Sequence, residues 1–168
     1  GLGDVYKRQA LYGSPLWTLL IACGLILMFK AILLARARRH GSPKTRVAAG
    51  WNAIRMLAEQ SGITAKGTRR DQAGAIARQL GTDDQALIQL GREADYATFS
   101  GQDIESGQAT TYWTGVDQLR KAMLASLPRF RRIRTRLSLK SVAILSNGHA
   151  AKPHTTHVKR TRKKGKAS

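Results

Sequence analysis

The order of apolar and polar positions divides the chain into one long apolar run and a series of shorter helical stripes. The run from Leu16 to Ala35 covers twenty residues, of which only Thr18 and Lys30 are distinctly polar. Twenty helical residues rise about 30 Å, which is the thickness of the hydrocarbon core of a bilayer. The pattern therefore predicts a membrane-spanning helix over residues 14–36. The alternative is a buried core helix of a water-soluble protein.

The residues at the two ends of the apolar run are typical of membrane interfaces. Trp17 lies near one edge, and Arg36, Arg38 and Arg39 follow the other. Lys30 comes five residues before the end of the run, so its side chain is expected to carry the ammonium to the interface. By the positive-inside rule, the C-terminal side of the span faces the cytoplasm.

Between residues 47 and 128, apolar side chains recur at intervals of three and four, which predicts four helices and no strand. Ser42-Pro43 supplies a cap and a first-turn proline for the first helix. Thr68 and Asp71 have the spacing of a capping box at the start of the second, and Gly81 follows its end.

Two further helices follow from similar signals. Thr82-Asp83-Asp84-Gln85 predicts a second capped start, with both acids at the positive end of the helix dipole. Asp83 and Asp84 are adjacent on that helix and do not face each other, so they are not predicted to act as a catalytic pair. A polar turn over residues 101–107 separates the third helix from the fourth, which Pro128 interrupts.

The predicted fold class is all-α: one transmembrane helix, a small bundle of about four helices and a disordered basic tail. The predicted core of the bundle consists of apolar side chains at helical spacing, namely Trp51, Ile54, Ile76, Leu80, Leu87, Leu90, Phe99, Tyr112, Trp113, Val116 and Leu119. The aromatic residues among them could instead line a ligand pocket, but core packing is the more common use, and no small-molecule ligand is predicted.

The net charge of +19 on 168 residues is unevenly distributed. Residues 30–46 carry six bases and no acid, residues 47–128 are nearly neutral, and residues 129–168 carry thirteen bases and no acid. The predicted segments are a stub at 1–13, the span at 14–36, a basic linker at 37–46, the helical domain at 47–128, a basic amphipathic segment at 129–145 and a disordered tail at 146–168. Residues 3–9 resemble translated sequencing-adapter read-through, so residues 1–9 are set aside; the stub is either artefactual or extracytoplasmic.

Three interpretations of the C-terminal charge remain open. Five arginines alternate with apolar residues after Pro128, and as a helix this segment would suit an anionic lipid surface. The basic tail could instead bind nucleic acid, although it lacks interleaved aromatic side chains for base stacking. It could also be a solvated tail that only reinforces topology. The candidate lipid-binding residues are Arg129, Arg131, Arg132, Arg134 and Arg136.

Few residues could carry chemistry. Cys23, the only cysteine, falls within the predicted span, and the four histidines have no metal-binding spacing. No catalytic, cofactor-binding or metal-binding residue is therefore predicted.

Several short motifs occur in the order of a known family. They are Gly50-Trp51-Asn52, Thr68-Arg69-Arg70-Asp71-Gln72-Ala73, Ala94-Asp95-Tyr96-Ala97-Thr98-Phe99-Ser100-Gly101, Tyr112-Trp113 and the stretch from Arg129 to Ser141. With the apolar run before them, residues 14–142 resemble the C-terminal end of actinobacterial TgpA-type transglutaminase-like membrane proteins. That family more usually has Glu at the position of Asp71, and either acid can cap a helix.

The resemblance implies a last membrane helix in the bacterial plasma membrane, followed by a cytoplasmic helical domain of unknown function. Transglutaminase-like chemistry needs a Cys nucleophile beside a His base, and here Cys23 lies in the span while every histidine follows it. The chain is thus expected to be a non-catalytic anchor and docking domain, with the parent's catalytic domain preceding residue 10. The resemblance also implies a cytoplasmic protein partner such as a MoxR-type ATPase.

Overall fold

The protein is described here by a computed structural model that covers residues 3–81 and 84–146. The predicted cap at Thr82 and Asp83, and the predicted disorder beyond residue 146, lie outside these ranges. Within them the fold is all-α, as the sequence predicts, and no strand occurs. The helices are α1 (Gly3–Arg39), α2 (Pro43–Gln60), α3 (Arg69–Leu80), α4 (Asp84–Phe99), α5 (Ser106–Ser126), α6 (Arg129–Leu137) and α7 (Ala143–Ser146).

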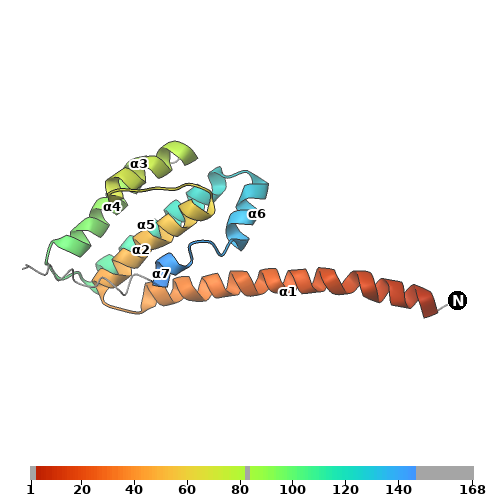
Figure 1. Ribbon diagram of the computed structural model, residues 1–168. Coiled ribbons are helices and arrows are strands. Elements are labelled where there is room, and N and C mark those ends of the chain that lie inside the picture. The colour runs from red at the N-terminus through yellow and green to blue at the C-terminus, as the bar shows by residue number, and fades with distance from the viewer. Residues whose placement is uncertain (1–2, 82–83, 147–168) are drawn as a thin grey trace, which may run out of the picture.

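A long rod and a compact bundle make up the molecule (Figure 1). α2 lies at the centre of the bundle, where it packs against α5 and α4, and α3 packs on α4. The C-terminal third of α1 contacts α2, α6 and α7, whereas the rest of α1 projects beyond the bundle (Figure 1). Only residues 40–42 connect α1 to α2, so most of the segment predicted as a linker is helical.

The predicted capping signals operate at the starts and ends of the bundle helices. Ser42 caps α2, since its side chain accepts a hydrogen bond from the backbone N–H of Thr45. Thr68 and Asp71 form the predicted capping box of α3, and each accepts from the other's backbone N–H. α3 ends at Gly81, whose φ of 61° lies in the left-handed region that glycine enters without strain.

The core of the bundle forms around two tryptophans, Trp51 of α2 and Trp113 of α5, which are 2% and 1% exposed. Nine of the predicted core residues are buried, namely Trp51, Ile54, Ile76, Leu87, Leu90, Tyr112, Trp113, Val116 and Leu119. Leu80 is partly buried and packs against this core. α6 and α7 also close over the bundle, because Thr135 and Leu145 are buried.

The prediction that Phe99 belongs to the core is wrong, because its side chain is 78% exposed. The buried stripe of α4 runs through Leu90, Ala94 and Ala97, and Phe99 follows two residues later. Two residues are about 200° around a helix, so Phe99 points away from the stripe. Its ring lies 6.0 Å from the guanidinium carbon of Arg69.

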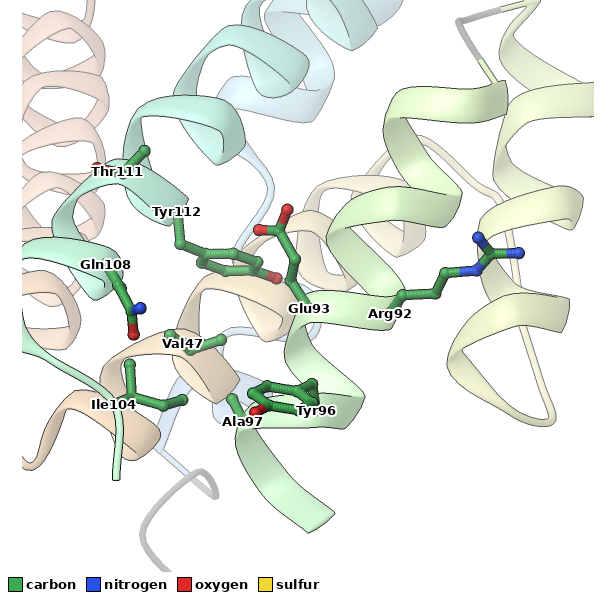
Figure 2. A pocket seen from close by; sticks show the side chains of 9 residues that line it. All are labelled: Val47, Arg92, Glu93, Tyr96, Ala97, Ile104, Gln108, Thr111 and Tyr112. Atoms are coloured by element: carbon green, nitrogen blue, oxygen red, sulfur yellow. The ribbon is translucent and has the colours of Figure 1, made fainter. Parts of the chain in front are cut away.

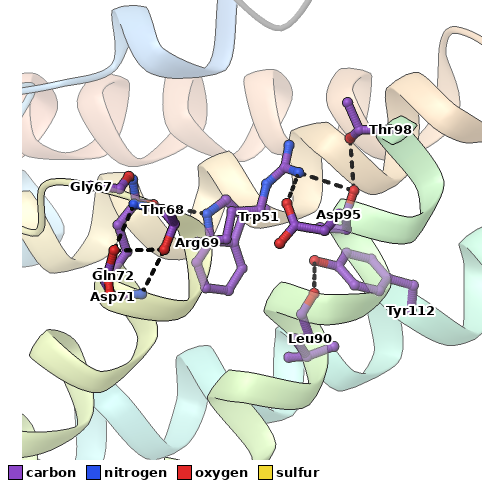
Figure 3. Close-up of polar contacts among 11 residues, drawn as sticks. Trp51, Gly67, Thr68, Arg69, Asp71, Gln72, Leu90, Asp95, Thr98 and Tyr112 are labelled. Carbon is purple, nitrogen blue, oxygen red and sulfur yellow. Dashed lines mark hydrogen bonds and ion pairs between the residues drawn. The ribbon is translucent and has the colours of Figure 1, made fainter. Parts of the chain in front are cut away.

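A chain of polar contacts fixes α3 and α4 against α2 and α5 (Figure 3). The indole N–H of Trp51 donates to Oε1 of Gln72 over 3.1 Å, and Nε2 of Gln72 donates to the carbonyl of Gly67 over 2.9 Å. Arg69 forms an ion pair of 2.6 Å with Asp95. Buried polar groups need such partners, because an unpaired one costs free energy.

Candidate functional site

The most concentrated polar cluster on α1 surrounds Lys30. Its ammonium Nζ lies 2.7 Å from Oε1 of Gln60 and 3.0–3.1 Å from the backbone carbonyl oxygens of Thr135, Arg136 and Ser138. Those carbonyls belong to the C-terminal end of α6, where the last carbonyls of a helix have no partners within it. Lys30 therefore fastens α1 to the ends of both α2 and α6.

Two of the predicted interface residues, Lys30 and Arg38, bind groups on the bundle. The oxygens that the ammonium of Lys30 binds belong to the bundle. Arg38 forms an ion pair of 2.8 Å with Asp117 of α5, and its guanidinium carbon lies 5.8 Å from the centre of the Trp113 ring. Both cations thus attach α1 to the bundle. Trp17, Arg36 and Arg39 are exposed.

Between Leu16 and Phe29, the bundle leaves most of the apolar side chains of α1 uncovered. Trp17 is 67% exposed and Leu19 is 61% exposed. Among the described residues, α1 is the one helix long and apolar enough to cross a membrane, over Pro15–Arg39. Beyond Lys30, by contrast, Leu33 and Leu34 pack against the core of the bundle.

The five predicted lipid-binding arginines lie on different sides of α6. Arg132 is turned toward α5, where its guanidinium donates to the carbonyls of Ala125 and Leu127 over 2.9 and 3.2 Å. The other four are exposed, namely Arg129, Arg131, Arg134 and Arg136. The segment is helical, as the amphipathic interpretation requires, and Phe130 is 79% exposed.

A groove of about 560 Å³ lies between α4 and α5, open to solvent. Figure 2 shows the ring of Tyr112 and the carboxylate of Glu93 pointing into it, whereas Arg92 points away toward α3. The lining residues are Val47, Arg92, Glu93, Tyr96, Ala97, Ile104, Gln108, Thr111 and Tyr112. A second groove continues along the same two helices and shares Glu93, Thr111 and Tyr112 with the first.

The hydroxyl of Tyr112, in the lining of the groove, has a structural role. Burial raises the pKa of Tyr112 well above its usual value, and its hydroxyl donates to the carbonyl of Leu90 over 3.2 Å. This phenol therefore stays protonated at neutral pH and holds α5 against α4. The carboxylate of Glu93 and the hydroxyl of Thr111 also line the groove. Among residues 3–81 and 84–146, no three His, Cys, Asp or Glu side chains gather as metal ligands.

Sequence reasoning missed the partners of Lys30 and the groove. The available signal was a lone polar residue in an otherwise apolar stripe, namely Lys30 in α1 and Gln60 at the end of α2, of which Gln60 is 8% exposed. Each of these residues needs a partner, but the pattern does not say which. No comparable signal points to the groove, since Ile104 and Gln108 follow no periodicity.

No protein-family model, curated protein or solved structure matches this chain.

Proposed function

We propose that this chain is a membrane anchor and docking domain: α1 spans the bilayer, and the α2–α7 bundle presents a protein-binding surface beside it. The observation that carries the proposal is the contrast within α1. Its apolar side chains from Leu16 to Phe29 are mostly exposed, whereas beyond Lys30 one face of α1 packs against the bundle through Leu33, Leu34 and Ala37. Ile32, on the other face, is 55% exposed. An exposed apolar face of this size is expected only where lipid or a partner covers it.

The position of Lys30 sets the register of the proposed span. Residues 16–29 alone rise about 21 Å, which is short of the hydrocarbon thickness of about 30 Å. The sequence has no charged residue from Ala10 to Phe29, and the backbone of α1 is helical throughout this stretch. The proposed span is therefore Ala10–Phe29, about six residues N-terminal to the span that the apolar run alone suggests.

The proposed orientation puts the bundle in the cytoplasm of a bacterial cell. Arg36, Arg39 and Lys44 follow the span, and the positive-inside rule assigns such a cluster to the cytoplasmic side. The resemblance to TgpA-type proteins supports the same orientation and a non-catalytic role. Under this proposal, the transglutaminase-like chemistry of the parent protein takes place across the membrane from the bundle.

Membrane extraction of the full chain tests the anchor. After alkaline carbonate treatment of bacterial membranes, the chain should remain in the pellet. The double variant Leu20→Asp/Leu25→Asp puts two charges on the exposed face of α1 and should release it, because a buried carboxylate costs about 3 kcal/mol at mid-membrane. The control Gln79→Asp/Ala125→Asp adds the same charge at exposed positions of the bundle and should stay membrane-bound. A wild-type chain that is extracted like a soluble protein overturns the anchor.

Cysteine labelling tests the orientation. In a Cys23→Ala background, Lys66→Cys places one thiol in the exposed loop between α2 and α3. A membrane-impermeant maleimide should label it only after the cells are broken. Labelling in intact cells overturns the cytoplasmic placement.

The α4–α5 groove is the proposed docking surface, and the resemblance makes a MoxR-type ATPase the partner to test. Its apolar floor includes Val47, Ala97 and Ile104, and it is open along one side. Ile104→Asp should weaken binding of a purified MoxR-type ATPase from the same genome at least tenfold, whereas Gln79→Asp, outside the groove, should not. Equal binding by both variants overturns this assignment.

A further inference from the structure

The outward face of α6 is an apolar stripe between arginines. Phe130 and Ile133 are 79% and 59% exposed, and Leu137 follows at the next helical interval. Thr135, on the opposite side of the helix, is 1% exposed and faces the bundle. Residues three and four apart share one face of a helix, so the stripe points away from the bundle.

Basic side chains border this stripe. With 100° between successive residues, Arg129 and Arg136 fall on one side of it and Arg134 on the other. All three are exposed, whereas Arg132 is held by carbonyls of the α5 end. An apolar stripe with cationic borders is the pattern of a helix that lies in the interfacial plane of a membrane.

The place of α6 in the fold matches that pattern. α6 crosses α1 rather than running along it, at the edge of the bundle from which the apolar part of α1 projects (Figure 1). The bonds from Lys30 to the carbonyls of Thr135 and Arg136 fix the end of α6 one residue beyond Phe29. A bilayer that covers α1 up to Phe29 therefore reaches its surface at the level of α6.

We propose that α6 is a second membrane contact that binds anionic phospholipid around the point where α1 leaves the bilayer. Phe130 and Ile133 enter the boundary between headgroups and acyl chains, and Arg129, Arg134 and Arg136 contact headgroup phosphates. This inference rests on the proposed α1 anchor. Lipid fits the face better than nucleic acid does, because two exposed apolar side chains lie beside an apolar span and would gain nothing from phosphates alone.

An environment-sensitive fluorophore on the full chain tests this contact. In a Cys23→Ala background, bimane is attached at Ile133→Cys or at the control position Lys121→Cys, which is exposed on α5. The chains are incorporated into phosphatidylcholine nanodiscs with and without phosphatidylglycerol. With phosphatidylglycerol, the probe at 133 should shift to the blue and be quenched by lipid spin-labelled near the headgroup, while the probe at 121 should do neither.

Two charge-matched variants test the arginines. Arg129→Gln/Arg134→Gln/Arg136→Gln should abolish most of the phosphatidylglycerol response at 133, because each arginine near an anionic surface contributes about fivefold to partitioning. The control Lys66→Gln/Arg78→Gln/Arg92→Gln removes three exposed charges from other parts of the bundle and should leave the response intact. Equal effects of the two triple variants would mean that net charge alone causes the phosphatidylglycerol response at 133. That result overturns the proposed lipid contact of α6.

The outcomes separate this inference from the anchor on which it rests. A chain that enters nanodiscs and resists carbonate extraction, but whose probe at 133 stays as water-exposed as that at 121, refutes the α6 contact alone. A chain that does not enter nanodiscs refutes the anchor. If double-stranded DNA shifts the probe at 133 in detergent and phosphatidylglycerol does not, the face binds nucleic acid and the lipid proposal is wrong.

Discussion

Lys30 and Gln60 are thirty residues apart in the sequence, and the ammonium of Lys30 donates a 2.7 Å hydrogen bond to Oε1 of Gln60. Gln60 in turn donates through Nε2 to the carbonyl of Lys140 over 2.9 Å. One glutamine side chain thus connects the long helix α1 to the segment after α6. Together with the Arg38–Asp117 ion pair, this connection holds the bundle and α6 on α1.

Replacing Lys30 by methionine tests the connection. Lys30→Met keeps the length of the side chain and removes the hydrogen bonds to the end of α6, which are worth about 1.5–3 kcal/mol when one partner is charged. We expect a lower free energy of unfolding in detergent micelles and faster proteolysis within α6. Arg39→Met, an exposed substitution ten residues beyond Phe29, is the control. Equal stability of the two variants contradicts the assigned role.

Gly50→Ala tests the close packing of α2 on α5. A Cβ at residue 50 would lie 2.7 Å from Cε1 of Tyr112 and 3.3 Å from Cγ2 of Val116, both in the buried core. We expect a loss of about 1–3 kcal/mol in the free energy of unfolding, as for other overpacked cores. Gly107→Ala is the matched control, because a Cβ there meets nothing within 4 Å. Chemical denaturation followed by tryptophan fluorescence measures both.

The α3 capping box predicts a pH dependence. Hydrogen bonds from the side chain and backbone of Thr68 lower the pKa of Asp71 below its usual 3.8. A lowered pKa in the folded state stabilises the fold above the unfolded pKa, and this stability is lost as the pH falls through the folded value. We therefore expect Asp71→Asn to be less stable than wild type at pH 7. This difference in stability should disappear as the pH falls below about 3.8. A difference that is constant from pH 7 to pH 2, measured by thermal unfolding, contradicts this.

Phe99 and Leu87 form a contrasting pair on α4. Phe99→Ser should change the free energy of unfolding by less than about 0.5 kcal/mol, because the ring is largely exposed. Leu87→Ala removes a side chain that is 0% exposed and should cost about 2–5 kcal/mol. Urea titration of both variants gives the comparison. A large loss in the free energy of unfolding for Phe99→Ser would mean that its side chain is part of the core after all.

The helical elements and most of the core follow from local patterns, because a cap or an apolar stripe needs only residues within a turn or two. Thr68 with Asp71 and the stripe through Leu87 and Leu90 are of this kind. Phe99 is the instructive exception, since its type suits a core but its angular position on α4 does not. Spacing counted from Ala97 would have excluded it.

The groove and the Lys30 cluster could not be predicted in the same way. Glu93 and Tyr112 come together because α4 and α5 pack at a distance that leaves a gap, and helix separation is a property of packing. Lys30 meets carbonyls of α6 more than one hundred residues later, and such backbone acceptors have no signature in the sequence.

The sequence by itself determined that the chain is helical, where α2 and α3 are capped, and that one stretch is apolar enough to cross a bilayer, since each depends on interactions between near neighbours. Only the tertiary structure decided where along α1 the contacts with the bundle begin. Lys30 is bound to Gln60 and to the end of α6, so one face of α1 packs on the bundle from that residue onward, and α6 lies beside the part of α1 that projects beyond it. Long-range packing selects these partners, and for that reason the apolar run alone does not identify them.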